Sequence, residues 1–122
     1  MKALAALALS LVSTAASAQF VALLKNSPAE LFDDMDLRIF LDTARRALDE
    51  GAENQAVAWK NPDTGHGGDM TVLKRFESKG RDCRLLRVRN EAQGRKGDSR
   101  LNLCKKDGKW RLLSVSQAKK AE

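Results

Sequence analysis

The chain has 122 residues, a formal net charge of +6, two cysteines and one histidine. This length suits a single domain with one hydrophobic core. A catalytic zinc centre usually needs three protein ligands, with histidine prominent among them, so the composition argues against such a centre and predicts no metal and no cofactor.

Residues 1–18 have the features of a signal peptide. Lys2 supplies a positive charge, residues 3–12 are almost entirely apolar, and residues 16–18 present the small-x-small pattern that signal peptidase accepts. The apolar stretch is roughly half the ~20 residues that cross a bilayer, so cleavage after Ala18 is expected and an uncleaved anchor is the alternative. We therefore expect a periplasmic or secreted protein with no transmembrane segment after cleavage, formed by a single domain over residues 19–122.

Two helix-start signals follow the predicted cleavage site. Residues 19–26 begin apolar and could pack as a short strand or an arm. Ser27 precedes a proline and lies three residues before Glu30, and Asp33 lies three residues before Asp36. Each pair has the spacing of a capping box, in which two side chains satisfy the first free amides of a helix.

One amphipathic helix is predicted over residues 34–50. Apolar residues recur there at the spacing of a buried helical stripe, which is formed by Leu37, Leu41, Ala44 and Leu48. Acidic residues lie near the start of this helix, where the helix dipole favours them. Gly51 is expected to end the helix in the left-handed conformation.

After this helix the periodicity changes to that of strands separated by turns. The expected strands are residues 55–60, 69–77, 83–90, 99–105 and 109–115. The connections contain glycine, proline, asparagine and aspartate, and they are short, so consecutive strands should pair antiparallel. The sequence therefore predicts an α+β fold, with an N-terminal amphipathic helix packed on an antiparallel meander of about five strands.

Cys83 and Cys104 are predicted to form a disulfide. Export exposes them to an oxidising compartment, and a pair of free thiols, one of them reactive, fits poorly with an exported chain that has no histidine beside either cysteine. If the third and fourth strands form a hairpin that pairs Leu86 with Leu101, the same register places the two cysteines directly opposite each other. A bridge that closes this loop would contribute about 3 kcal/mol.

The segment around His66 is the best candidate for a reactive loop. Asp63 and Asp69 flank the histidine and could orient it as a base or share a metal with it. The structural alternative, which we favour, is a turn with an exposed histidine and no catalytic residue. Trp59 and Trp110 could stack on a ligand, although filling the core is the favoured role for both.

Positive charge is concentrated in the second part of the chain. Residues 19–58 hold four basic and eight acidic side chains, whereas residues 59–122 hold seventeen basic and eight acidic ones. Arg87 and Arg100 would be direct neighbours of like charge in the predicted register, and this pair would either attract a counter-charge or be softened by Asp98 and Glu91. The alternative is an ordinary solvated sheet face. The candidate anion-binding residues are Arg84, Arg87, Arg89, Arg100, Lys105 and Arg111.

Two motifs resemble the C-terminal domain of the bacterial 17 kDa outer-membrane surface antigen family. The first is a W-x-N-P-x-T-G pattern and the second a C-x-x-D-G-x-W pattern, and their characteristic residues are Trp59, Asn61, Pro62, Thr64, Gly65, Cys104 and Trp110. The resemblance covers about residues 47–115. It implies an envelope protein of gram-negative bacteria with a small β-rich domain and no established enzymatic activity.

The chain departs from that family in two respects. Its predicted cleavage junction has Gln19 where lipid-anchored members have a cysteine, and a charged amphipathic helix stands where many members have a glycine zipper. Both differences favour a free periplasmic or secreted protein. The resulting hypothesis is a non-catalytic cell-envelope module that acts by binding or structural support.

The sequence also leads to expectations for the partner and to an alternative for the activity. The partner is expected to be an anionic envelope component, such as a polymer or a lipid headgroup, or another envelope protein. Nucleic acid is not expected in this compartment. An enzyme that uses the His66 loop would need a pocket beside that loop with a second titratable group.

Overall fold

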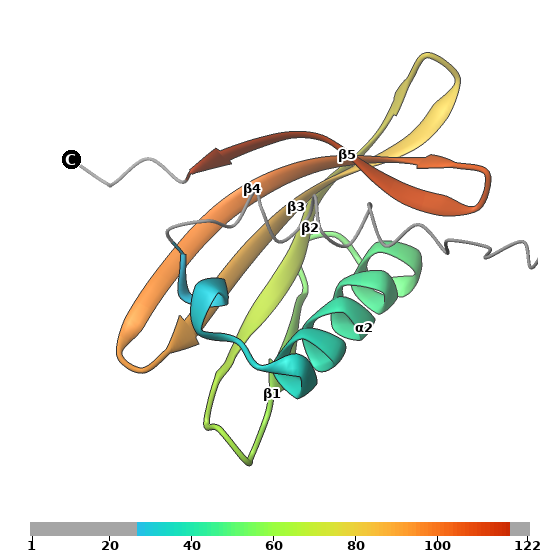
Figure 1. Ribbon diagram of the computed structural model, residues 1–122. Coiled ribbons are helices and arrows are strands. Elements are labelled where there is room, and N and C mark those ends of the chain that lie inside the picture. The colour runs from blue at the N-terminus through green and yellow to red at the C-terminus, as the bar shows by residue number, and fades with distance from the viewer. Residues whose placement is uncertain (1–26, 118–122) are drawn as a thin grey trace, which may run out of the picture.

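The computed structural model describes residues 27–117, in which two helical segments lie on one side of an antiparallel sheet (Figure 1). The predicted signal peptide and residues 19–26 lie outside the described residues. In chain order the elements are the 3-10 helix η1 (Pro28–Leu31), the helix α2 (Asp34–Glu50) and the strands β1 (Ala56–Lys60), β2 (Gly67–Ser78), β3 (Arg81–Ala92), β4 (Arg95–Lys106) and β5 (Lys109–Gln117). Among these described helices, none has the length and apolar character needed to cross a membrane. The predicted α+β architecture is confirmed.

The helix α2 begins and ends where the sequence predicted. The Asp33 side chain accepts a hydrogen bond from the Asp36 amide at 2.7 Å, and the Asp36 carboxylate accepts one from the Asp33 amide at 2.9 Å. The prediction for Gly51 was wrong, because its φ of −66° is not left-handed. Glycine is needed there for another reason, since a Cβ atom would lie 2.4 Å from the Ala47 carbonyl oxygen.

The five strands pair in chain order as an antiparallel meander. Three connections are tight turns whose two central residues both have positive φ: Lys79-Gly80, Gln93-Gly94 and Asp107-Gly108. Such turns match the twist of the strands that they join, so pairing begins immediately on either side. For this reason β3 and β4 extend beyond the predicted strands 83–90 and 99–105, and all residues between these two ranges except Gln93 and Gly94 belong to β3 or β4.

One face of the sheet packs against α2 and η1, and the core lies between them. Strand alternation sends the large buried side chains to this helix face, where Trp59, Met70, Leu86 and Leu101 pack with Phe40 of α2. Within residues 27–117, no helix or strand covers the opposite face, which we call the open face (Figure 1). A single solvated face is common in antiparallel sheets.

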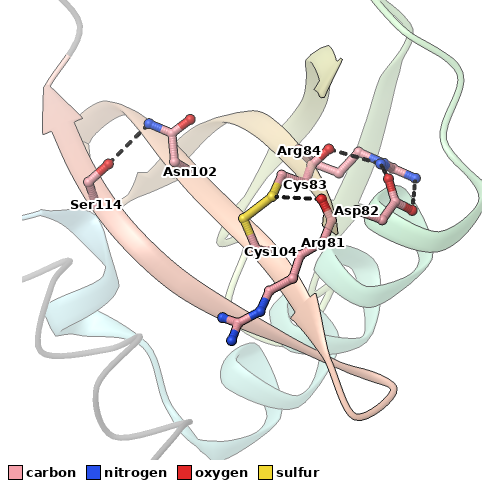
Figure 2. Close-up of a disulfide and its surroundings, with 7 residues drawn as sticks. All are labelled: Arg81, Asp82, Cys83, Arg84, Asn102, Cys104 and Ser114. Carbon is pink, nitrogen blue, oxygen red and sulfur yellow. Dashed lines mark hydrogen bonds and ion pairs between the residues drawn. A yellow bond between two sulfur atoms is a disulfide. The ribbon is translucent and has the colours of Figure 1, made fainter. Parts of the chain in front are cut away.

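Cys83 and Cys104 form the predicted disulfide, with an S–S distance of 2.01 Å (Figure 2). Cys83 pairs with Cys104 and Leu86 with Leu101, so the register deduced from the sequence is confirmed. Both cysteines project from the open face because they alternate with the core residues of β3 and β4. The bridge therefore joins the two central hairpin strands on the side away from the hydrophobic core.

Candidate functional site

Among residues 27–117, the polar side chain with the most hydrogen-bond partners is the Asp36 carboxylate, at the start of α2. Its side chain is completely buried. One oxygen, Oδ1, accepts hydrogen bonds from Asn61 Nδ2 at 2.8 Å and from Thr64 Oγ1 at 2.7 Å. The other, Oδ2, accepts from the Asp33 amide at 2.9 Å and lies 2.8 Å from His66 Nδ1. The first turn of the helix is thereby joined to the β1–β2 loop.

Local hydrogen bonds fix the shape of the β1–β2 loop, which supplies three of these partners. The Asn61 side chain accepts from the Asp63 amide at 3.1 Å, and Thr64 Oγ1 accepts from the His66 amide at 3.1 Å. The Asn61 carbonyl accepts from the Gly65 amide at 2.8 Å, and Gly65 has a φ of 76° that favours glycine. Asn61, Thr64 and Gly65 of the first motif therefore serve to present this loop to α2.

The expectation of an exposed histidine was wrong. His66 is only 6% exposed, and its ring stacks on Phe32 at a centroid distance of 6.2 Å. The residue that orients its ring is Asp36, thirty positions earlier in the chain, whereas the flanking Asp69 pairs with Arg89 instead. Since a carboxylate only accepts hydrogen bonds, the Nδ1 atom of His66 carries the proton in this contact.

Asp36 is held in its charged form. Burial raises the pKa of its carboxyl group, but the hydrogen bonds from the Asp33 amide, Thr64, His66 and Asn61 outweigh burial and lower the pKa from 3.8 to about 2. A carboxyl group with a lowered pKa in the folded state stabilises the fold at pH values above its unfolded pKa. This contribution disappears as the pH falls through the folded pKa.

We expect acid to destabilise the protein partly through Asp36. The pKa difference corresponds to about 2 kcal/mol, present above about pH 4 and lost as the pH falls toward 2. Urea denaturation of the wild type and of Asp36→Asn between about pH 5 and about pH 2 checks this, because the difference between the two proteins isolates Asp36 from other carboxylates. A difference that does not shrink over this range would contradict the assignment.

An aspartate that orients a histidine is also the arrangement found in many hydrolases. Here, however, three of the four hydrogen-bond partners of Asp36 come from the β1–β2 loop and the fourth is the Asp33 amide, and the nearby Thr64 hydroxyl donates to the same carboxylate. The protein has a groove of about 420 Å³ beside Asp69 and Arg89 and another of about 230 Å³ beside Gly51. His66 lines neither groove. Within residues 27–117, no cluster of three metal-binding side chains occurs.

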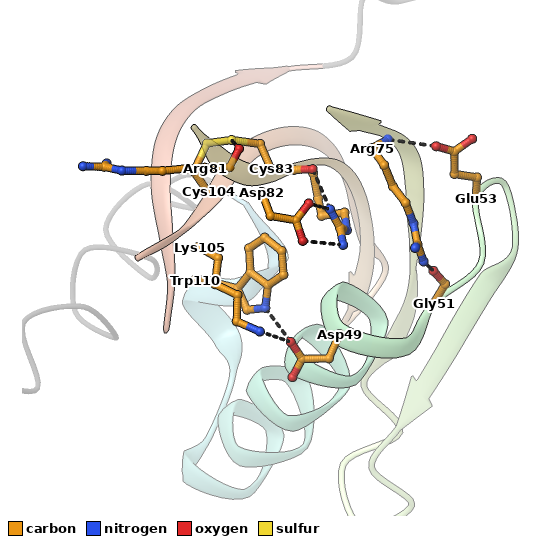
Figure 3. A network of polar contacts seen from close by, with 11 residues as sticks. Asp49, Gly51, Glu53, Arg75, Arg81, Asp82, Cys83, Cys104, Lys105 and Trp110 are labelled. Carbon is orange, nitrogen blue, oxygen red and sulfur yellow. Dashed lines mark hydrogen bonds and ion pairs between the residues drawn. A yellow bond between two sulfur atoms is a disulfide. The ribbon is translucent and has the colours of Figure 1, made fainter. Parts of the chain in front are cut away.

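The two tryptophans differ in their burial. Trp59 is buried in the core and its Nε1 donates to Asn90 Oδ1 at 3.2 Å. Trp110 packs against the edge of the core, and its Nε1 donates to Asp49 Oδ1 at 2.8 Å (Figure 3). The Arg84 guanidinium lies 5.1 Å from the Trp110 ring centroid, and the ring joins β5 to the end of α2. The favoured prediction of a core-filling role is confirmed for Trp59, whereas Trp110 is only partly buried and packs against the core.

The six candidate anion-binding residues do not share one face of the sheet. Arg87, Arg89, Arg100 and Arg111 project from the open face, whereas Arg84 and Lys105 project from the helix face. Arg84 is 6% exposed, pairs with Asp82 and donates to the Cys83 carbonyl at 2.9 Å (Figure 2). The Nζ atom of Lys105 lies 3.8 Å from Oδ1 of Asp49. Both residues belong to the packing around Trp110 (Figure 3).

Two of the four candidate arginines on the open face are neutralised by aspartates. Arg87 binds Asp98 through Nε at 3.0 Å and through Nη2, and this pairing lowers the pKa of Asp98. Arg89 binds both oxygens of Asp69 at 2.9 Å. Arg87 and Arg100 are direct cross-strand neighbours, as the sequence predicted, and Asp98 supplies the counter-charge. These pairs stabilise the sheet and neutralise Arg87 and Arg89.

This arrangement of a capped helix, a meander sheet and a loop fixed by an asparagine and a threonine defines a small β-rich domain. The family model for the 17 kDa outer membrane surface antigen matches residues 46–111, more than half of the chain. The chain therefore belongs to the 17 kDa outer membrane surface antigen family. The match includes the loop residues that bind Asp36, and Asp36 itself precedes it.

Individual relatives are similar to the chain over 84 residues. The 17 kDa surface antigen of Rickettsia prowazekii (strain Madrid E) is 30% identical over 84 residues, which cover 67% of this chain and 53% of the relative. Those of Rickettsia conorii (strain ATCC VR-613 / Malish 7) and Rickettsia rickettsii are 31% identical over the same length and shares. The chain thus spans about half the length of the curated relatives it matches. No solved structure is significantly similar to it.

Proposed function

We propose that this protein is a non-catalytic module of the cell envelope that acts by binding or by structural support. The observation that carries the proposal is the structural role of the family motif, whose residues bind a buried carboxylate. Asn61, Thr64 and His66 converge on the buried carboxylate of Asp36 and join the loop to the helix. A group that is both buried and fully hydrogen-bonded is suited to holding a fold and poorly placed to reach a substrate.

The proposed location is the periplasm or the outside of the cell, reached after cleavage at Ala18. The family description, which refers to an outer membrane surface antigen, supports a place in the envelope. The disulfide supports an oxidising compartment. Attachment through an N-terminal lipid is not part of the proposal, because Gln19 follows the predicted cleavage site.

A second candidate function is binding of an anionic envelope polymer or lipid headgroup by the open face. In residues 27–117, strand register assigns ten basic and three acidic side chains to the open face, a net charge of +7. The remaining eight basic and twelve acidic side chains of the same residues give a net charge of −4. Such separation of charge orients a protein toward an anionic partner.

The test of the non-catalytic proposal uses His66→Gln. We expect this variant to lose about 1 to 2 kcal/mol of stability, because a buried hydrogen bond to a carboxylate is weakened. Both proteins should be assayed, at a temperature where each is folded by circular dichroism, against ester, phosphoester, glycoside and peptide substrates. We expect no turnover from either. Turnover by the wild type that a folded His66→Gln variant lacks would refute the proposal.

A further inference from the structure

The end of the open face around the disulfide has a charge pattern of its own. Cys83 pairs with Cys104, and Cys104 pairs with Arg111 of β5. Arg81 precedes Cys83 by two residues and Lys106 follows Cys104 by two, so both project from the same face as the disulfide. Lys109 pairs with Lys106 and joins them. Four cations from three strands thus lie beside one disulfide.

Two β-bulges determine which residues reach this end of the open face. The register of β2 shifts between Val72 and Lys74, and beyond the shift Lys74 pairs with Leu85 and Phe76 with Cys83. Because Val72 is a core residue, unbroken alternation would have sent Lys74 and Phe76 toward the helix. The bulge instead adds a cation and an aromatic ring to the disulfide end of the open face.

The bulge in β5 has the same effect on Arg111. The register of β4 with β5 shifts between Asn102 and Leu103, so that Ser114 pairs with Asn102 and Leu112 with Leu103. Leu113 occupies the bulge and is 56% exposed. Unbroken alternation from Ser114 would have sent Arg111 to the helix face. With the bulge, Arg111 lies on the open face beside the disulfide.

These residues form a basic ring that lies beside two apolar side chains. The basic ring consists of Lys74, Arg81, Lys106, Lys109 and Arg111, all of which are exposed. Partly exposed Phe76, which pairs with Cys83, and Leu85, which pairs with Lys74, lie at the β2 side of the ring next to the buried disulfide, and we call them the apolar patch. With neighbouring strands about 4.8 Å apart, the ring extends about 14 Å from β2 to β5. It is therefore a broad surface and not a pocket for a single small ion.

The charge of the basic ring is not compensated on the open face. The three acidic side chains of that face, Asp69, Glu91 and Asp98, all lie toward the opposite end of the strands, where two of them pair with arginines. Within the described part of the chain, no member of the basic ring forms an ion pair. Several unpaired cations within one Debye length of each other add their potentials and attract a multivalent anionic surface.

We propose that the basic ring binds the phosphate-bearing surface of an anionic lipid bilayer, with Phe76 and Leu85 directed into the interface. This inference rests on the proposed function, of which it specifies the partner. Cations beside a small apolar patch match the layered chemistry of a bilayer surface, in which phosphates lie outside the acyl region. An acidic glycan offers charge but no acyl region for the apolar patch. The net negative charge of the rest of the described residues favours the same orientation.

The main test measures binding of the processed protein, purified from the cell, to phosphatidylcholine vesicles with and without phosphatidylglycerol. We expect binding only to the anionic vesicles. The triple variant Arg81→Gln, Lys109→Gln, Arg111→Gln should bind on the order of 100-fold more weakly, since each basic residue near an anionic surface strengthens binding by about fivefold. The matched control carries the same charge change on α2, in Arg38→Gln, Arg45→Gln, Arg46→Gln, and should bind within about threefold of the wild type.

A second measurement tests whether the apolar patch enters the bilayer interface. In the variant Phe76→Trp, nitroxide-labelled lipid in anionic vesicles should quench fluorescence beyond the level seen for the two native tryptophans. Four outcomes would each overturn the inference. The first two are a lack of extra quenching and an equal loss of binding in the two triple variants. The others are equal binding to neutral vesicles and a preference for an acidic polysaccharide over anionic vesicles.

The failure of this inference and that of the proposed function can be told apart with lipid-free cell-wall fragments. If the wild type ignores anionic vesicles but sediments with such fragments, the bilayer inference fails while the envelope-binding function stands. If the wild type binds neither preparation, the bilayer inference and the envelope-binding role both fail.

Discussion

Replacing Asp36 with alanine is expected to lower the free energy of unfolding by about 3 to 5 kcal/mol. The substitution leaves the Asn61 amide, the Thr64 hydroxyl, the His66 ring and one backbone amide without their acceptor in a buried position. Each unsatisfied buried donor costs about 1 to 3 kcal/mol, and water entering the space recovers part of the loss. Denaturation by urea, followed by the fluorescence of the two tryptophans, measures the change.

Two further variants make this result specific. Asp34→Ala removes an exposed carboxylate from the same turn of α2 and should cost less than about 1 kcal/mol, because only the interaction with the helix dipole is lost. Asp36→Asn keeps the shape but has one oxygen and one amide where four donors converge, so its cost should approach that of alanine. Similar stability of Asp36→Ala and Asp34→Ala would show that the loop does not depend on Asp36.

The same network shows where prediction from the sequence ended. The capping box and the W-x-N-P-x-T-G motif were both visible in the sequence, and each was correctly placed at a helix start and in a turn. Their contact was not visible, because a buried hydrogen bond between residues 36 and 66 leaves no local periodic signal. Considered without Asp36, His66 resembled an exposed residue in a glycine-rich turn, although it is buried.

The strands show a second limit of prediction from the sequence. Alternation and turn residues predicted all five strands, and the cysteine pair fixed the register of the third and fourth. Alternation also separates Arg84 and Lys105 from the cysteines beside them, and applying it would have removed both from a common anion-binding face. The sides on which Lys74 and Arg111 lie depend on β-bulges, which shift the alternation of side chains. No distinctive residue in the sequence predicts these bulges.

Removal of the disulfide is the second large effect that we expect. Replacing both cysteines with alanine should lower the free energy of unfolding by about 3 kcal/mol, because the bridge restricts the unfolded chain by closing a loop between residues 21 positions apart. The folded state should change little at first, since the core lies on the other face of the sheet and does not depend on the sulfurs. Reduction with dithiothreitol should give a similar loss in the wild type and no effect on the double alanine variant.

The position of the bridge predicts which part of the sheet opens once it is absent. Cys83 and Cys104 lie near the ends of β3 and β4 that are farther from their tight turn, and β4 continues from there into β5. Amide hydrogen exchange should therefore increase most in β5 and at the adjoining ends of β3 and β4, while β1 and the first part of β2, held by the Asp36 network, change least. Uniform acceleration over the whole sheet would show that the bridge stabilises the fold as one unit. Unchanged exchange and an unchanged urea midpoint after verified reduction would show that packing on the helix face alone maintains the register.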